Sequence, residues 1–380
     1  MLPRKAKMAW VTPQYSKKKV MKAGSTLFDE RASDEAFEEA LLILSNWRSS
    51  HSYPVNTFQA SLRNKLKSLG IKGLVAQRLK RIPSIVAKLE RFPGMSLARM
   101  QDIGGLRAVV PSLKSIYKLR ESYLLSRWDH ILVSEYDYIK HPKDSGYRGI
   151  HLVYKYNNRK GDAKNYEGLQ LEIQIRNEVQ HAWATAVETA GVFLNQALKS
   201  SMGNARWLEF FEYASSSFAL MEDCEVLQAH RHLSKAEILK NTIDIATELE
   251  VIDKLTVYNS IVEELHHTQD EKTHYYLLEL NTQDKNVTVN GYSREELPKA
   301  TDDYLEREKA AQRNDSVQVV LVAAQSVSAL KKAYPNYFLD TGRFVARLRR
   351  IGLIVARGDD PMPPPPGGFR KPKATAPAIE

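Results

Sequence analysis

Residues 171–176 read Leu171-Glu172-Ile173-Gln174-Ile175-Arg176, and this stretch decides the fold class. Apolar and polar residues alternate with a period of two, which is the period of a β-strand. One face of the strand is therefore aliphatic, while the other carries a carboxylate, an amide and a guanidinium in a row. A half-exposed strand without a catalytic role has the same alternation. The meaning of the polar face therefore depends on the segments around it.

Helical and strand patterns surround this stretch in an order typical of a mixed α+β domain. Apolar runs predict further strands over 103–110 and 150–156, and the quoted stretch extends over 169–175. Apolar residues at helical spacing predict helices over 34–47, after Pro54, after Pro83, over 178–198, over 205–221 and over the long stretch 234–266.

The pattern changes near residue 272. Two strands over 275–280 and 287–289, a charged helix over 293–312, a strand over 317–323 and a short helix with Lys331 and Tyr334 predict a small α+β unit. We expect a flexible basic arm over 1–24, a main domain over 25–270, this small unit over 271–356 and a disordered proline-rich tail over 357–380.

The composition excludes several classes of protein. A chain of 380 residues, 43% of them hydrophobic, suffices for about two domains. No apolar run approaches the roughly 20 residues that cross a bilayer, and no apolar segment follows the basic N-terminus, so neither a membrane partner nor a secretory signal is expected. The single cysteine, Cys224, cannot form an internal disulfide or a zinc ribbon. We expect a cytoplasmic protein.

Positive charge gathers in two parts of the chain. The net charge of +10 indicates a polyanionic partner such as a nucleic acid or phosphates. One cluster lies within residues 1–22 and includes Lys17, Lys18 and Lys19, and the other lies within 63–91. A solvated basic surface is the alternative for any single lysine. The density of the clusters favours an anion-binding role.

Candidate phosphate ligands lie in the second cluster. Lys80, Ser84 and Lys88 are four residues apart, so they share a face if the helix extends back to Lys80. If the helix begins at Pro83, its free N–H groups point towards Arg78 and Lys80 instead, and either arrangement suits a phosphate. The glycines of a Walker A loop are absent, and a solvated basic helix is the alternative.

Asp102 stands at the start of a predicted strand, and Arg107 follows five residues later. Carboxylates at the ends of neighbouring strands, here Asp102 and Glu172, suit Mg²⁺, which prefers oxygen ligands and nucleotide phosphates. A turn residue at the strand end is the alternative for Asp102.

The segment 141–151 presents Tyr147 in a turn directly before a strand. An aromatic ring flanked by Lys143 and Arg148 suits stacking on a base while the cations hold phosphates. Packing of the ring over a strand edge is the alternative, and an isolated histidine such as His151 is more often structural than catalytic.

Taken in this order, these segments resemble the RelA/SpoT-like synthetases over roughly residues 75–190. The matching positions are Arg78, Lys80, Ser84, Lys88, Asp102, Arg107, Gly146, Tyr147, Ile150, His151, the run from Glu172 to Arg176, His181 and Trp183.

The resemblance implies a nucleotidyltransferase-like mixed sheet flanked by helices. It also implies Mg²⁺-dependent transfer of the β,γ-pyrophosphate of ATP to a ribose 3′-hydroxyl, with release of AMP. In this family pattern Asp102 and Glu172 are the catalytic carboxylates and metal ligands, and Glu172 is also the base. The ATP-binding residues are Arg78 at the adenine, and Lys80, Ser84, Lys88, Arg107 and His151 at the phosphates. The acceptor-binding residues are Tyr147, which stacks on the base, with Lys143, Gln174 and Arg176.

The acceptor is expected to be RNA. The long RelA/SpoT proteins carry a hydrolase domain with a His-Asp dyad, which this sequence lacks, and Ser145 stands where the guanine site usually has asparagine. A hydroxyl cannot make the paired contacts of an amide. The basic arm with Lys17, Lys18 and Lys19 suits tRNA phosphates. The alternative is a GDP or GTP pyrophosphokinase that makes (p)ppGpp.

The layout is similar to the toxic small alarmone synthetases, and within them to the CapRel toxin–antitoxin fusions. Those enzymes pyrophosphorylate the 3′ CCA end of tRNA and stop translation. Trp47-Arg48 and His51-x-Tyr53-Pro54 resemble that branch, and Tyr334-Pro335-Asn336-Tyr337 resembles its regulatory YxxY element. The resemblance implies a C-terminal pseudo-zinc-finger antitoxin domain that inhibits the enzyme until a phage major capsid protein binds. Packing of Tyr334 and Tyr337 against Phe338 is the alternative.

Overall fold

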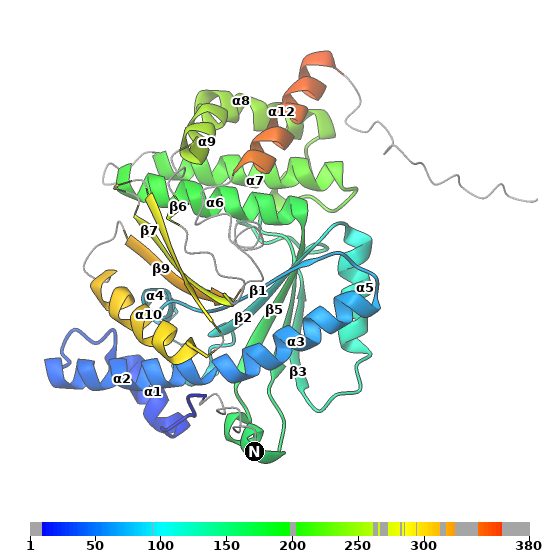
Figure 1. Cartoon of the computed structure of the whole chain (residues 1–380). Coiled ribbons are helices and arrows are strands. Elements are labelled where there is room, and N and C mark those ends of the chain that lie inside the picture. The colour runs from blue at the N-terminus through cyan, green and yellow to red at the C-terminus, as the bar shows by residue number, and fades with distance from the viewer. Residues whose placement is uncertain are drawn as a thin grey trace, which may run out of the picture.

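The computed structural model describes residues 10–92, 94–197, 203–260, 265–266, 273–281, 283–284, 286–293, 295–311, 317–323 and 341–358. Their strands form one mixed sheet in the order β3-β4-β5-β2-β1-β9-β7-β8-β6 (Figure 1). The strands are β1 (Leu74–Leu79), β2 (Gly104–Val110), β3 (Ile131–Asp137), β4 (Ile150–Lys155), β5 (Gln170–Asn177), β6 (Leu265–His266), β7 (Tyr275–Asn281), β8 (Asn286–Tyr292) and β9 (Val317–Ala323). The helices are α1 (Lys17–Thr26), α2 (Asp34–Ser50), α3 (Ser52–Ser68), α4 (Ile82–Arg91), α5 (Leu113–Leu124), α6 (Glu178–Ala197), α7 (Gly203–Met221), α8 (Lys235–Glu248), α9 (Val251–Ser260), α10 (Leu297–Ala311) and α12 (Gly342–Arg357), with short 3₁₀ turns at Leu97–Arg99, Gly161–Tyr166 and Gln228–His230. The mixed α+β class expected from the sequence is confirmed.

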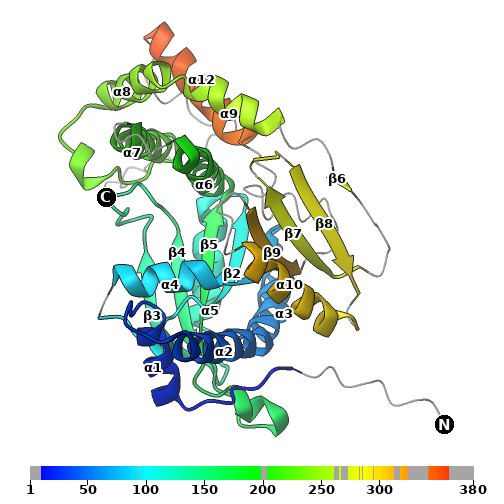
Figure 2. The same ribbon diagram turned by 90° about the vertical axis from the view of Figure 1, so that its left-hand side faces the viewer.

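The alternating pattern of β5 divides the sheet into an apolar face and a polar face. Leu171, Ile173 and Ile175 are fully buried in the main core, to which α3 and α5 contribute. Figure 2 shows α3 and α5 behind the β2–β5 part of the sheet and α4 in front of it. The polar residues of β5 therefore lie on the face that α4 borders.

A second apolar cluster lies at one end of the sheet, where α6 to α9 and α12 pack together (Figure 1). Phe344, Leu348 and Ile351 recur at helical spacing on α12 and are fully buried in this cluster. Gly358 ends α12 with a φ of 64°, a left-handed conformation that glycine adopts without strain. The last described helix of the chain is thus part of the core formed by α6 to α9.

The C-terminal strands extend the sheet of the main domain. β9 pairs antiparallel with β7, and it meets β1 through the pairing of Val322 with Arg78. Tyr275, Tyr292 and Tyr304 form a small core between these strands and α10. This arrangement brings α10 beside α4 and the end of α2, although these two helices lie far from α10 in the sequence (Figure 1).

Several sequence predictions need correction. Residues 17–24, expected in a flexible arm, belong to α1, where Val20 and Ala23 are buried against the core. The predicted long helix 234–266 is two helices and a short strand, and Glu250, with a φ of 53°, separates α8 from α9. The sequence analysis missed β1 and β3. Tyr334, Tyr337 and residues 359–380 lie outside the described residues.

Among the residues that the structure describes, no helix is both long enough and apolar enough to cross a membrane.

Candidate active site

The polar face of the sheet lines up the predicted site residues through strand register. Gly105 on β2 is paired with both Arg78 on β1 and Glu172 on β5. One step along, Gln174 on β5 is paired with both Arg107 on β2 and His151 on β4. Paired residues of neighbouring strands point to the same side. The polar groups therefore gather on one surface.

A polar cavity lies over this surface. Six predicted site residues line it: Arg78, Lys80, Asp102, Arg107, Glu172 and Gln174. Gly105 forms part of its floor, where the missing side chain leaves room between Arg78 and Glu172. The structure thus brings both predicted carboxylates together with three predicted ATP-binding cations, Arg78, Lys80 and Arg107.

Asp102 is held by two predicted phosphate-binding lysines, of which Lys80 lines the cavity and Lys88 does not. Lys80 Nζ lies 3.0 Å from Asp102 Oδ2, and Lys88 Nζ lies 2.9 Å from Oδ1. Burial raises the pKa of Asp102, but the two ammonium groups outweigh it, so the pKa lies below its ordinary value. Asp102 is therefore ionised at neutral pH.

The helix behind these cations begins at Ile82, with Pro83 in its first turn. The arrangement in which α4 extends back to Lys80 is therefore wrong, and the alternative start near Pro83 is close to the observed one. Lys80 and Lys88 do not share a helix face, but both contact the carboxylate of Asp102. Ser84 is half-buried on α4 and is not among the residues that line the cavity.

Glu172 accepts a hydrogen bond on each oxygen. His151 Nδ1 lies 2.6 Å from Oε1, and Gln174 Nε2 donates to Oε2 over 2.7 Å. Burial opposes the ionisation of Glu172, yet the hydrogen bonds from His151 and Gln174 and the charge of Lys88 hold its pKa below its ordinary value. Glu172 is thus an oriented carboxylate.

The network around Glu172 continues to the predicted acceptor tyrosine. Tyr147 Oη lies 2.5 Å from His151 Nε2, and Arg176 Nε donates to Tyr147 Oη over 3.0 Å. Arg176 also donates to Gln174 Oε1 over 2.8 Å, which closes a ring of five side chains. Burial lowers the pKa of His151, so the imidazole is neutral at pH 7. Its Nδ1–H then donates to Glu172, and its Nε2 accepts from the tyrosine.

Cations cover the ring of Tyr147. The guanidinium of Arg176 lies 4.8 Å from the ring centroid, and the ammonium of Lys143 lies 5.4 Å from it. Lys143 is exposed, whereas Arg176 is buried. An acceptor base that stacks on Tyr147 would displace the exposed lysine side chain rather than the buried arginine.

Helix α7 fixes the loop that carries Tyr147. Ser215 Oγ donates to the carbonyl of Gly146 over 2.5 Å, and buried Arg148 donates to Glu222 Oε2 over 2.8 Å. Gly146 has a φ of +89°, and a side chain there would meet Trp183 at 2.9 Å. The glycine is therefore required both by backbone conformation and by space.

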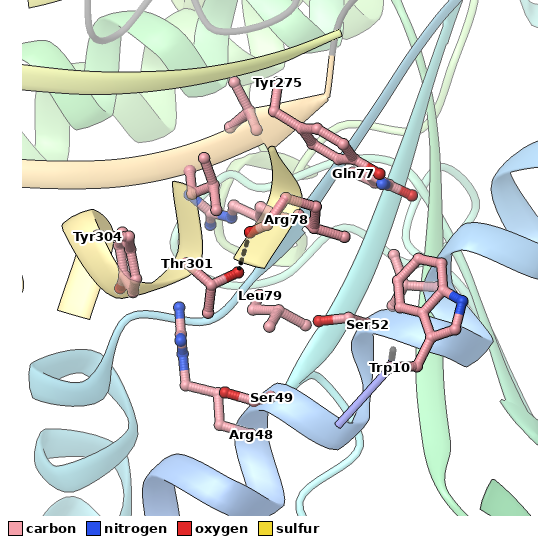
Figure 3. Close-up of a pocket in the computed structure, with 14 residues that line it drawn as sticks. Trp10, Arg48, Ser49, Ser52, Gln77, Arg78, Leu79, Tyr275, Thr301 and Tyr304 are labelled. Carbon is pink, nitrogen blue, oxygen red and sulfur yellow. Dashed lines mark hydrogen bonds between the residues drawn. The ribbon is translucent and has the colours of Figure 1, made fainter. Parts of the chain in front are cut away.

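A second cavity borders the first one, between the main domain and the C-terminal strands (Figure 3). Arg78 lines both cavities, and the second is also lined by Arg48, Tyr275 and Tyr304. Arg48 is buried, and its Nε donates to the Lys80 carbonyl over 2.6 Å. The sequence analysis noted Trp47-Arg48 but gave Arg48 no role. Its burial depends on contacts with residues far away in the sequence, so no local pattern marks it.

The predicted RNA-binding lysines lie apart from both cavities. Lys17, Lys18 and Lys19 are exposed on α1, and none of them lines either cavity. Lys19 forms an ion pair with Glu39 over 2.8 Å. Their role remains a prediction.

The site offers oxygen ligands for a metal. Within the described part of the chain, no group of three or more histidine, cysteine, aspartate or glutamate side chains could hold a metal ion. Asp102 and Glu172 nevertheless line one cavity. Mg²⁺ is usually held by one or two carboxylates together with water and substrate phosphates. The pair fits that pattern.

Part of this chain is similar to known proteins. Residues 77–193 match the family model described as "Region found in RelA / SpoT proteins". GTP pyrophosphokinase YjbM of Bacillus subtilis is 36% identical over 113 residues, which are 29% of this chain and 52% of the relative. The GTP pyrophosphokinase of Escherichia coli K12 is 27% identical over 139 residues, which are 37% of this chain and 17% of the relative.

Among solved structures, small alarmone synthetase 1 of Bacillus subtilis bound to its product pppGpp matches with 26% identity and a TM-score of 0.39, over 50% of this chain and 94% of that one. The chain spans about half the length of YjbM. The matched region holds every residue that lines the polar cavity except Ala76.

Proposed function

We propose that this chain, which carries a RelA/SpoT synthetase region over residues 77–193, transfers pyrophosphate from ATP to a 3′-hydroxyl. The observation that carries the proposal is the polar cavity in which Asp102 and Glu172 meet Arg78, Lys80 and Arg107. Phosphoryl-type transfer needs positioned positive charge and a positioned base more than covalent catalysis. The cavity combines both.

In the proposed reaction the acceptor 3′-oxygen attacks the β-phosphorus of ATP. The bond from that phosphorus to the bridging α,β-oxygen breaks, AMP leaves, and the hydroxyl proton passes to Glu172. Lys80, Lys88 and Arg107 neutralise the charge that develops on the phosphates. Asp102 and Glu172 would hold Mg²⁺, which would supply further positive charge to stabilise the phosphates.

The ring of hydrogen bonds around Glu172 supports its role as the base. His151 and Gln174 fix the two carboxylate oxygens, so that the free lone pairs keep one orientation towards the cavity. Tyr147 is joined to the same ring and would stack on the acceptor base. Base and acceptor platform are thereby held in one rigid unit.

For the acceptor we propose the 3′ CCA end of tRNA, with inhibition of translation as the outcome. Support comes from Ser145 and from the exposed lysines of α1. GDP or GTP is the second candidate, favoured by the names of the related GTP pyrophosphokinases. Replacing Lys17 and Lys18 by glutamine should reduce the salt slope of tRNA modification by about 1.5. Lys240→Gln, an exposed neutralisation on α8, is the control, and equal slopes would remove these lysines from RNA binding.

We further propose that the C-terminal unit inhibits the enzyme and that a phage major capsid protein releases it. The pairing of Val322 on β9 with Arg78 on β1 supports the first part, because it connects this unit to a strand that lines the polar cavity. Tyr334 and Tyr337 remain the predicted regulatory pair. Replacing both by alanine should make the expressed chain toxic to bacteria, whereas unchanged growth with an intact fold would contradict their role.

The direct test offers γ-labelled ATP and Mg²⁺ to the full chain with deacylated tRNA, GDP or GTP. Truncation after residue 270 is unsuitable because it removes α12 from the core of α6 to α9. Label on tRNA supports the first acceptor, and label on GDP or GTP supports the second. No transfer to any of the three, with or without the two tyrosine substitutions, contradicts the proposed activity.

A further inference from the structure

Helix α10 turns one face into the ATP-binding end of the main domain. Ala300, Tyr304 and Glu308 recur every four residues along α10, and all three are buried. The strand pairing between β9 and β1 holds α10 in this place (Figures 1 and 2). The buried carboxylate of Glu308 on this face is unusual, because ionised groups are rarely buried without a partner.

Tyr304 lies against the guanidinium of Arg48. The Arg48 Cζ atom is 4.7 Å from the ring centroid, and both side chains are almost fully buried. Figure 3 shows the two side chains next to each other at the edge of the cavity that Arg78 also lines. A flat ring on a guanidinium plane is the contact that a nucleobase makes with arginine. The tyrosine thus fills the place that a base would take.

Glu308 lies one helical turn further along α10, at the beginning of α4. The backbone N–H of Ile82 donates to Glu308 Oε1 over 2.9 Å. The first N–H groups of a helix, with the positive end of its dipole, form an anion site that suits phosphate or carboxylate alike. Lys80 lies two residues before the first residue of α4. The carboxylate thus fills the place that a phosphate would take.

We propose that α10 is an internal mimic of ATP, in which Tyr304 replaces the base on Arg48 and Glu308 replaces a phosphate at the start of α4. This inference rests on the proposed function, because it assumes that ATP binds this site. It assigns the inhibition to a segment other than the Tyr334–Tyr337 pair. Docked α10 and bound ATP then exclude each other.

One feature of Glu308 destabilises the docked position of α10. Glu308 Oε2 is buried and has no hydrogen-bond partner among the described residues. An unsatisfied buried acceptor weakens the docked state, because the carboxylate regains hydration when α10 leaves. ATP, or a partner that binds the outer face of α10, has therefore only a small free-energy difference to overcome.

The test measures binding of a non-hydrolysable ATP analogue to the full chain by calorimetry. The informative variants are Glu308→Ala and Tyr304→Leu, and the matched control is Glu306→Ala, an exposed glutamate on the outer face of α10. Loss of a hydrogen bond to a charged group corresponds to roughly a 10- to 100-fold change in equilibrium. We expect the apparent Kd to fall by that factor in Glu308→Ala, to fall also in Tyr304→Leu, which loses the contact with Arg48, and to stay unchanged in the control.

Binding is read without turnover, so it separates this inference from the proposed reaction. Equal Kd values in the wild type, Glu308→Ala and Glu306→Ala overturn the mimic while leaving the ATP site in place. Absence of analogue binding in all folded variants overturns both proposals. Should Tyr304→Leu fail to fold, Glu308→Ala alone decides the outcome. Hydrogen exchange adds a second criterion, because the analogue should increase exchange along α10, and unchanged protection with the analogue bound refutes competition.

Discussion

Replacing Glu222 by glutamine should lower the free energy of unfolding by about 3–5 kcal/mol, because it leaves a buried arginine charge without its counter-ion. Arg148 donates to Glu222 Oε2 over 2.8 Å, and its side chain is only 2% exposed. The other oxygen of Glu222 accepts from Asn177 Nδ2 at the end of β5. A glutamine has only one oxygen that can accept, so its NH₂ group would face either Arg148 or Asn177, both of which are donors.

The same substitution should impair acceptor binding, because Arg148 follows Tyr147 in the loop before β4. We expect a raised KM for the acceptor and little change in the affinity for the ATP analogue. The assays are urea unfolding at constant pH and steady-state kinetics at temperatures at which the variant stays folded.

Asp244→Asn is the matched control, since it neutralises an acid in an exposed i,i+4 ion pair with Lys240. Such pairs contribute about 0.3–0.5 kcal/mol. If Glu222→Gln lowers the free energy of unfolding as little as the control does, the buried charge pair between Arg148 and the residue after α7 does not hold the acceptor loop.

Three further variants probe the fold and the site. Burial lowers the pKa of His51 to about 4, below its unfolded value, so its contribution to stability is complete above about pH 6.5 and is lost as the pH falls towards 4. Between pH 7 and pH 5, the free energy of unfolding in urea should therefore fall less in His51→Asn than in the wild type. An equal fall in both would contradict this. His151→Ala removes a donor from Glu172 and should reduce kcat about tenfold or more, with partial rescue in His151→Gln, and a fall in thermal stability with unchanged kcat would restrict His151 to a structural role. Gly146→Ala combines backbone strain with a steric clash and should raise the KM for the acceptor. Gly161→Ala is its control, because φ is 53° there and an added Cβ has no atom within 4 Å, so it meets strain alone. Equal KM values in the two variants would contradict a steric role for Gly146.

The centre of the fold could be predicted because its strands carry clear alternation. β2, β4 and β5 were each placed within a residue or two, since burial of one face determines which side chains point inward. The grouping of Asp102, Arg107, Glu172 and Gln174 followed from that alternation together with the family resemblance. The structure adds the register that makes them neighbours.

Other elements gave no such signal. β1 reads Leu-Val-Ala-Gln-Arg-Leu, and its strand conformation depends on pairing with β2 along its whole length. β3 is an edge strand with exposed apolar residues, so it lacks the inside–outside contrast on which pattern reading depends. The break at Glu250 is a left-handed residue without glycine, which no local pattern announces.

Long-range contacts account for what was missed in the site. Arg48 and Lys80 are separated by 32 residues, and Ile82 and Glu308 by 226. Within its own helix Glu308 is one of several charged residues of α10, and only the tertiary structure distinguishes it from exposed Glu306. The hydrogen-bonded ring through Tyr147 and His151 likewise depends on how β4 and β5 align.

The measurement that tests the central claim most directly is AMP formation from ATP in the presence of acceptor, compared between the full chain and Glu172→Gln. Both should be measured alone and combined with Glu308→Ala, so that docked α10 cannot hide the activity. We predict acceptor-dependent AMP formation that falls by about 10²- to 10⁴-fold in Glu172→Gln while folding and ATP-analogue binding persist. AMP formation at an undiminished rate in Glu172→Gln would contradict the assignment of this carboxylate as the base of a pyrophosphokinase.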